Sequence, residues 1–317
     1  MSSDIKVSVC VVTYNQERYI AECLQSLVDQ VTDFPFEIIV GEDCSTDETR
    51  KVVESFAQRY PDLIVRNYHD KNVGAVQNAI TSYRMAKGKY ICHMDGDDGA
   101  LPNKLKKAAG LLDDRDELVM VTHDMIVVNK ESLKESDSLK KYSEGVYSIE
   151  GLIFNFPFFA NSAKMVRREA CINSLGQLTD NAIDVELHVL EARFGSIFHI
   201  DSPLGYYRAM VGISSSQNRV NPLIVDGYHR VFNGLIEKSL ADIEIASNDL
   251  KKMYAKAMLN FAYQSVFFGN CGDAIKYSLK SLNIKFFSMK QLVVLVLSFL
   301  GPLAKKMAFL RYKLKNM

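Results

Sequence analysis

The chain has 317 residues, 48% of them hydrophobic, and its 38 basic residues are balanced by 38 acidic ones. A chain of this length and composition can bury a full core, so the sequence indicates a globular protein rather than a disordered one. The six cysteines lie far apart without a Cys-x-x-Cys pair, which argues against a zinc site or a disulfide framework and favours a reducing compartment.

Strand and helix patterns alternate four times in the first 95 residues. Ser45 and Glu48 have the spacing of a capping box before the second helix. The alternation predicts an α/β fold, in which helices cover both faces of an open and mostly parallel sheet. The predicted strands lie at 6–15, 36–43, 63–69 and 89–95, and the predicted helices at 17–30, 48–60 and 75–88.

Polar residues follow three of these strands at the point where each strand ends. They are Thr13-Tyr14-Asn15, Glu42-Asp43 and the run from Asp95 to Asp98. Ligands of such sheets bind beyond the carboxyl ends of the strands, so we expect the three clusters to form one site. No Gly-x-Gly-x-x-Gly follows the first strand and no Gly-x-x-x-x-Gly-Lys-Ser/Thr is present, so neither a dinucleotide site nor a P-loop is supported.

The acidic run places Asp95, Asp97 and Asp98 directly after a buried strand, where like charges repel one another. Mg²⁺ or Mn²⁺ would relieve this repulsion, because these ions commonly use one or two carboxylates together with substrate phosphates. A calcium loop is disfavoured, since its twelfth position would be Lys106. Two alternatives stay open. The acids could cap the following helix, or one could be a phosphatase-type nucleophile, although the companion Lys and Thr motifs of phosphatases are not evident.

After residue 102 the pattern predicts a helix at 103–114, a strand at 117–128 and an exposed charged segment at 131–145. A further helix carries Ile183, Leu187 and Leu190 at helical spacing, with Asp184 near its start, and a strand at 196–201 follows. From about residue 218 only helical patterns remain, including a helical hairpin at 251–282 that turns at 269–272. We therefore expect a catalytic domain at 1–218 and a helical region at 219–317.

The end of the chain is strongly basic. Residues 274–317 contain nine Lys or Arg and no Asp or Glu, which is typical of contact with an anionic membrane or with nucleic acid. No nucleic-acid motif accompanies the charge, so we expect no nucleic-acid partner. The apolar run at 292–300 is shorter than the roughly 20 residues that span a bilayer. It is either an interfacial segment on anionic lipid or a core helix with a solvated basic end.

Five segments of the chain resemble the family 2 glycosyltransferases, which have the nucleotide-diphospho-sugar transferase (GT-A) fold. They are VSVCVVTYNQERYIAECLQSL, EIIVGEDCSTDETRKVV, NVGAVQNAI, AKGKYICHMDGDD and LPNKL, in the family's order and spacing. The resemblance covers about residues 5 to 215. It implies an inverting, metal-dependent transfer of a sugar from a nucleotide diphosphate sugar to an acceptor hydroxyl, as in bacterial surface-polysaccharide enzymes. The acceptor would be a glycan or a lipid-linked glycan.

The resemblance also implies roles for individual residues. Asp97 would bind Mn²⁺ or Mg²⁺, and Asp95 would bind the metal or the ribose. Asp43 would accept the base N–H, which favours a UDP-sugar, although it could instead only begin a turn with Ser45. Asp184 would be the catalytic base, with Asp180 and Glu186 as further candidates, or it would be merely a helix N-terminal acid. The remaining donor-binding residues would be Thr13, Tyr14, Asn15, Asn78 and Arg208.

Two positions depart from the family pattern. Gln77 stands where an Arg often precedes the Asn, and Met210 stands where a metal-binding His often lies. These departures leave open a second function, a catalytically silent nucleotide-sugar-binding or scaffold protein. Nucleotidyltransfer is not favoured, because the first strand is not followed by a glycine-rich and basic loop. The first strand begins without a preceding charged and apolar leader, so we expect a cytoplasmic protein, peripheral on the inner face of the membrane if the tail binds lipid.

Overall fold

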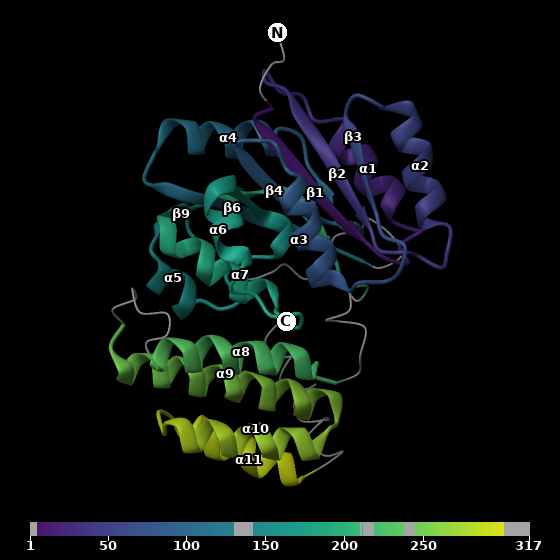
Figure 1. Cartoon of the computed structure of the whole chain (residues 1–317). Coiled ribbons are helices and arrows are strands. Elements are labelled where there is room, and N and C mark those ends of the chain that lie inside the picture. The colour runs from purple at the N-terminus through teal and green to yellow at the C-terminus, as the bar shows by residue number, and fades with distance from the viewer. Residues whose placement is uncertain (1–4, 130–141, 210, 212–218, 238–244, 301–317) are drawn as a thin grey trace. The chain divides into compact units, whose positions relative to one another are not determined.

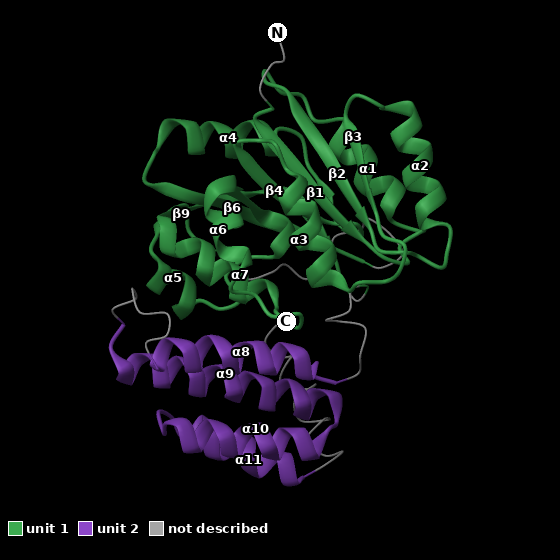
Figure 2. Cartoon of the chain, viewed as in Figure 1, with its two compact units in different colours: residues 1–212 green, residues 213–317 purple. Residues whose placement is uncertain are grey.

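The computed structural model describes residues 5–129, 142–209, 211, 219–237 and 245–300. The chain forms two compact units, unit 1 at 1–212 and unit 2 at 213–317 (Figure 2). The domain boundary expected near residue 218 lies in the segment 212–218, outside the described residues. The charged segment expected at 131–145 falls largely on residues 130–141, which are also outside them.

Unit 1 is built on a nine-stranded sheet in the order β3-β2-β1-β4-β8-β6-β9-β5, with β7 paired to β9 (Figure 1). β3, β2, β1 and β4 run parallel, which confirms the predicted α/β class. β8 is antiparallel to β4 and β6, and this insertion was not predicted. The strands are β1 (Val7–Thr13), β2 (Phe36–Glu42), β3 (Ile64–Tyr68), β4 (Tyr90–Asp95), β5 (Gly99–Ala100), β6 (Leu118–Val128), β7 (Gly145–Tyr147), β8 (Lys164–Arg167) and β9 (Ser196–Arg208).

Helices cover both faces of the sheet, and β1 is accordingly buried along almost its whole length. Val9 and Val11 belong to the same core layer as the apolar sides of α1, α2 and α4. Cys10 points to the other face, where its Sγ contacts the carbonyl of Ser82 in α3. The helices of unit 1 are α1 (Ile20–Val28), α2 (Thr49–Arg59), α3 (Ala75–Met85), α4 (Lys104–Asp114), α5 (Ile149–Phe154), α6 (Arg168–Leu175) and α7 (Asp184–Glu191).

The predicted capping box before α2 is wrong. α2 begins at Thr49, and Asp47 Oδ1 accepts from the Thr49 N–H at 2.9 Å. Ser45 instead accepts a hydrogen bond from the backbone N–H of Asn15 at 3.0 Å. The Ser45 hydroxyl therefore joins the loop after β1 to the loop after β2.

Unit 2 consists of helices in its described part: α8 (Pro222–Ile236), α9 (Ser247–Phe268), α10 (Cys271–Ile284) and α11 (Lys290–Phe299). The predicted hairpin is confirmed as α9 and α10. Gly269 ends α9 in the left-handed region at φ 82°, where a residue without Cβ is favoured. Among the described residues, no helix has the length and hydropathy needed to cross a membrane.

Candidate active site

The ends of three neighbouring strands meet at one edge of the sheet, as predicted. The backbone N–H of Asp43 donates to the carbonyl of Thr13 at 3.1 Å, which joins the ends of β2 and β1. The N–H of Gly96 donates to the carbonyl of Val12 at 2.9 Å, which joins β1 to the acidic turn, residues 95–98 after β4. The fold thus brings together residues about eighty positions apart in the sequence.

Gly96 lets the acidic turn lie directly against the end of β1. A Cβ at this position would stand 2.5 Å from Gln16 Oε1 and 2.9 Å from Thr13 Cβ, which is too close for any side chain. Thr13 is buried, and its hydroxyl donates to Gln16 Oε1 at 2.8 Å. Thr13 is therefore packed against the acidic turn at Gly96.

The carboxylates of the acidic turn are crowded and poorly compensated. Burial, followed by the charge of Asp95, raises the pKa of Asp97 to about 7. Burial, with the charges of Asp95 and Asp97, also raises the pKa of Asp98, and Asp98 Oδ2 is buried without a hydrogen-bond partner. The positive charges of Arg208 and Lys104 offset the crowding of these carboxylates only in part, and a bound cation would supply more.

Asp95 is the most accessible carboxylate of the turn, with 42% of its side chain exposed. Burial opposes its ionisation, but His93 and Ser162 outweigh this and lower its pKa. His93 Nε2 lies 3.1 Å from Asp95 Oδ1, and the Tyr83 hydroxyl lies 2.6 Å from His93 Nδ1. Asp95 is thus held in one orientation by a buried chain of partners.

Sequence reasoning did not identify His93, Ser162 or Lys104 as part of the site. Ser162 accepts from the Asp95 N–H at 2.9 Å and donates to Asp95 Oδ2 at 3.2 Å. Lys104 is buried, and its ammonium donates to the carbonyl of Ser162. His93 could have been found, because residues i and i+2 of a strand share a face and His93 precedes Asp95 by two.

Arg208 holds the acidic turn rather than facing a ligand. Its N–H donates to Asp98 Oδ1 at 3.0 Å and its Nε to the carbonyl of Asp97 at 3.1 Å. Its Nη2 donates to Glu22 Oε1 at 2.8 Å, and only 3% of the residue is exposed. The expected contact of Arg208 with a diphosphate is therefore corrected to a positioning role.

Asn78 likewise does not line the site. It is fully buried, with Nδ2 donating to the carbonyl of Gly41 at 2.8 Å and Oδ1 lying 3.2 Å from His69 Nε2. Both polar atoms of its amide are already used within the protein. Asn78 fixes α3 against β2, an arrangement that does not favour the predicted contact with the donor.

Asp43, Tyr14 and Asn15 lie around the same strand ends. Asp43 is buried, and its carboxylate accepts from the N–H groups of Val73 at 2.7 Å and of Gly74 at 2.9 Å. The alternative in which Asp43 only begins a turn with Ser45 is not observed, because the Ser45 N–H donates to Glu42 instead. Tyr14 and Asn15 are exposed, and Asn15 adopts φ 52°.

Replacing Asp43 with Ala is expected to lower the free energy of unfolding by about 2 kcal/mol, because two backbone N–H groups lose an ionised acceptor. Urea denaturation of the purified variant measures the change. Asp70→Ala is the matched control, since Asp70 is an exposed carboxylate of the loop between β3 and α3 that contains Val73 and Gly74. Equal stability of both variants would contradict this role for Asp43.

Asp184 is the first residue of α7 and is exposed to solvent. Its Oδ1 accepts from the Val185 N–H at 2.8 Å. Although the residue is exposed at the surface, desolvation of its carboxyl group by the surrounding protein raises the pKa of Asp184, and the negative charge of Asp95 raises it further. Asp184 stays the predicted base.

The other two candidates for the base have contacts of their own. Asp180 Oδ1 accepts from Gln77 Nε2 at 2.9 Å. Gln77, which differs from the family pattern, therefore binds a carboxylate. Glu186 Oε1 accepts from the backbone N–H of Ile183 at 2.8 Å and so stabilises the start of α7. Asp184 also accepts a backbone hydrogen bond, so these contacts do not choose among the three candidates.

A divalent ion fits the oxygen ligands of the acidic turn. Carboxylate oxygens are the preferred ligands of Mg²⁺ and Mn²⁺, and burial together with the charge of Asp95 raises the pKa of Asp97 although Arg208 opposes the shift. Across the described ranges, no group of three or more His, Cys, Asp or Glu side chains is arranged to hold a metal by itself. Met210, which stands where a metal-binding His often lies in the family, is outside the described residues.

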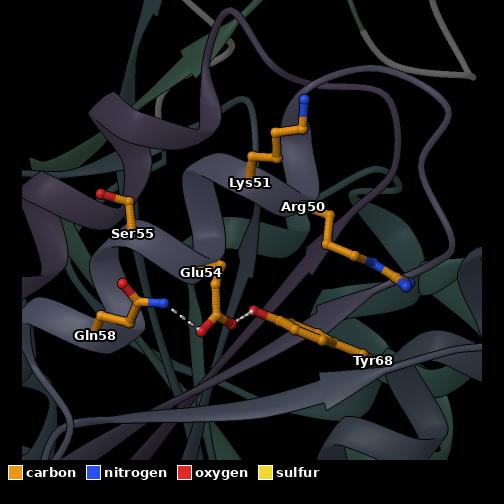
Figure 3. A pocket seen from close by; sticks show the side chains of 6 residues that line it. All are labelled: Arg50, Lys51, Glu54, Ser55, Gln58 and Tyr68. Carbon is orange, nitrogen blue, oxygen red and sulfur yellow. Dashed lines mark hydrogen bonds between the residues drawn. The ribbon is translucent and has the colours of Figure 1, made fainter.

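A separate surface depression of about 370 Å³ lies between α2 and β3 (Figure 3). Glu54 is at its centre, and it accepts hydrogen bonds from Gln58 and from the Tyr68 hydroxyl. Arg66, followed by Gln58, lowers the pKa of Glu54 to about 2. This depression is lined by a solvated ion-pair network, and none of the predicted site residues lines it.

Comparison with protein families gives one match over half of the chain. The family described as "Glycosyl transferase family 2" matches residues 8–175. The uncharacterized protein Rv1520 of Mycobacterium tuberculosis is 30% identical over 203 residues, which cover 64% of this chain and 58% of that protein. The chain thus spans little more than half the length of this relative. Poly(ribitol-phosphate) beta-N-acetylglucosaminyltransferase TarS of Staphylococcus aureus is 37% identical over 113 residues, 35% of this chain and 19% of TarS.

Solved structures share the fold at low sequence identity. TarS 1–349 of S. aureus in complex with UDP-GlcNAc aligns with a TM-score of 0.63 and 20% identity, over 96% of this chain and 89% of that one. A mannosyltransferase of Pyrobaculum calidifontis in complex with GDP-Man and Mn²⁺ aligns with a TM-score of 0.55 and 16% identity, over 98% and 87% of the two chains. The GT-A fold expected from the sequence is therefore confirmed.

Proposed function

The chain belongs to glycosyl transferase family 2, and from this premise we propose that it transfers a sugar from a nucleotide diphosphate sugar to an acceptor hydroxyl, with inversion at the anomeric carbon. One observation carries the proposal. The acidic turn lies at the carboxyl end of β4, beside the ends of β1 and β2, and its carboxylates lack full compensation by positive charge. A cation bound to a diphosphate would supply that charge.

Asp97 and Asp95 are the residues that would hold Mn²⁺ or Mg²⁺, which would act as a Lewis acid on the leaving diphosphate. The protein fixes the carboxylate of Asp95 and the backbone of Asp97 in advance. His93 and Ser162 orient the carboxylate of Asp95, and Arg208 ties down the backbone of Asp97. Such partners behind a ligand set its orientation, so little reorganisation remains when the donor binds.

The preferred donor is a UDP-sugar. The imide edge of uracil presents one N–H between two carbonyls, and a carboxylate accepts this N–H specifically. Each oxygen of Asp43 already accepts one backbone hydrogen bond, but a carboxylate has about four acceptor sites, so capacity remains. The exposed Tyr14 and Asn15 lie after the same strand end and are the further candidates for contact with the nucleotide. The TarS complexes with UDP and UDP-GlcNAc support this choice.

The proposed acceptor is a glycan or a lipid-linked glycan. This proposal rests on the resemblance to surface-polysaccharide enzymes and on the polymer named as the substrate of TarS, poly(ribitol-phosphate). An acceptor on a lipid carrier would bring the enzyme to the inner face of the membrane.

Asp184 is the proposed base that takes the proton of the acceptor hydroxyl. Asp184→Asn is expected to lower kcat by about 10²–10⁴-fold while the Kd for UDP stays unchanged. The base must be ionised and its pKa is raised, so the wild-type rate should fall as pH falls through that pKa. The variant should lack this dependence, and a pH series of initial rates measures it.

Asp180→Asn is the matched control, because it removes a neighbouring carboxylate that is bound to Gln77. We expect Asp180→Asn to keep both the rate and its pH dependence. If Asp184→Asn transferred sugar at the wild-type rate, the base would have to be sought elsewhere.

The second candidate function, a silent nucleotide-sugar-binding protein, is favoured by the Gln77 contact with Asp180, which puts an amide where the family often has a cation. Turnover separates the two functions. The purified protein should bind UDP with Mn²⁺ and transfer or slowly hydrolyse at least one donor in a panel of nucleotide sugars. Binding without any turnover would favour the silent protein.

A further inference from the structure

The last described helix, α11, buries two polar residues together with Val294 and leaves most of its other apolar residues exposed or half-buried. Gln291 is fully buried and Ser298 is 1% exposed, whereas Val293 is 52%, Val296 60% and Phe299 69% exposed. A helix that packs on a core normally shows the opposite arrangement. The exposed apolar side of α11 therefore requires an explanation other than packing within unit 2.

Hydrogen bonds fix this orientation of α11. Gln291 Nε2 donates to Ser281 Oγ at 2.9 Å and to the carbonyl of Lys285 at 3.0 Å. Gln291 Oε1 accepts from the N–H of Phe287 at 2.8 Å and from the N–H of Ser288. Turning the apolar side inward would expose these polar groups or leave them buried without hydrogen bonds. A buried amide without a partner lowers the free energy of unfolding. The apolar side thus faces solvent because the hydrogen bonds of Gln291 hold the opposite side of α11 inside.

The exposed side chains form one continuous stripe, which we call the α11 face. Its members recur at spacings of three and four residues, as on one side of a helix. The ten residues of α11 are about 15 Å long, too short to cross a bilayer but long enough to lie along its surface. The α11 face consists of Met289, Leu292, Val293, Val296, Phe299 and Leu300.

The sequence around the α11 face is basic. The described residues 274–300 contain Lys276, Lys280, Lys285 and Lys290 and no acidic residue. The sequence that follows, residues 301–317, adds five more Lys or Arg and again no acid. An apolar stripe beside basic residues combines the two attractions that bind a helix to an anionic bilayer.

We propose that the α11 face docks on an anionic lipid bilayer, with the apolar stripe in the acyl boundary and the lysines at the headgroups. A second copy of the chain is a poorer occupant, because two such basic regions would repel each other. The docking extends the proposed function by placing the enzyme where a lipid-linked acceptor is found. It does not require that sugar transfer occur, so binding and turnover can be tested separately.

The test is flotation of the full-length protein, without nucleotide, with vesicles of phosphatidylcholine containing about 30% phosphatidylglycerol. The variant Val293→Glu/Val296→Glu places two charges on the α11 face. The control Asn260→Glu/Gln264→Glu places the same two charges on exposed positions of α9. We expect the first variant to lose about tenfold or more in partition coefficient and the control to bind like the wild type.

Circular dichroism and UDP binding establish that both variants are folded. Pure phosphatidylcholine vesicles should recover little protein, and salt at about 0.5 M should weaken binding to the anionic ones. Equal flotation of the wild type and of Val293→Glu/Val296→Glu would overturn the proposal. Failure of the wild type to float, together with self-association in sedimentation that the same variant abolishes, would assign the α11 face to a second copy instead.

Discussion

Replacing Asp97 with Asn is expected to lower sugar transfer by about a thousandfold or more. The variant keeps the size of the side chain but removes the charge that would hold a divalent ion against the donor diphosphate. Initial rates with saturating donor and Mn²⁺ measure the loss. Calorimetric titration should show that Mn²⁺ no longer strengthens the binding of UDP, as it does for the wild type.

Asp62→Asn is the matched control, because Asp62 is an exposed acid of the α2–β3 turn. It should retain the wild-type rate and the wild-type sensitivity to EDTA. Full transfer by Asp97→Asn that EDTA does not inhibit would show that the acidic turn does not hold the metal.

Asp97→Asn should also change how the free energy of unfolding depends on pH in the metal-free protein. The pKa of Asp97 is raised from 3.8 to about 7 in the folded state. The folded state therefore binds more protons than the unfolded state between these values, and the free energy of unfolding falls as pH rises from about 4 to about 7. Asp97→Asn should reduce this slope, and urea denaturation at several pH values measures it.

Removing one partner of the buried pair Lys164 and Glu191 is expected to cost about 3–5 kcal/mol of stability. The Lys164 Nζ lies 2.8 Å from Glu191 Oε2, and both side chains are 0% exposed. Glu191 Oε1 is also buried without a hydrogen-bond partner. Lys164→Met would therefore leave an uncompensated charge in the interior. Denaturant unfolding of the variant gives the change in free energy.

The double variant Lys164→Met/Glu191→Leu is the informative companion. It removes both charges, so it should recover much of the stability that the single variant loses. The pair joins β8 to the end of α7, the helix that begins with Asp184, so the single variant should also lower kcat. A loss below about 1 kcal/mol in Lys164→Met would contradict the assigned importance of the pair.

The sequence predicted the strand ends of the site because the buried parallel strands are short, apolar and regularly spaced. It could not predict where a polar side chain at a strand end would point. Asn78 and Arg208 were assigned to the donor, yet the Asn78 amide binds Gly41 and the Arg208 guanidinium binds Glu22. A pattern places such a residue near the edge, but tertiary partners decide its direction.

The residues that orient Asp95 escaped prediction for a related reason. Ser162 comes from the segment before β8, a short strand that pairs antiparallel between β4 and β6. The sequence of β8, Lys-Met-Val-Arg, has two apolar residues between two charges and predicts no strand. The buried Lys164 would by composition be placed on the surface. Only the fold shows that the strand and its lysine are interior.

The basic end of the chain was left with two interpretations, and the periodicity of α11 could not choose between them. Apolar spacing identifies a helix with an apolar side but does not say which side is buried. The hydrogen bonds of Gln291 hold one side of α11 inside and leave Val293, Val296 and Phe299 exposed, which favours the interfacial segment as a proposal.

The central claim is that the acidic turn holds a divalent ion against the diphosphate of a sugar donor. Diffraction from crystals grown with UDP and Mn²⁺, recorded near the manganese absorption edge, tests it most directly. We predict an anomalous peak within about 2.3 Å of a carboxylate oxygen of Asp97, in contact with the diphosphate. Bound UDP with no manganese peak at residues 95–98, or with the Asp97 carboxylate turned away from it, would contradict the claim.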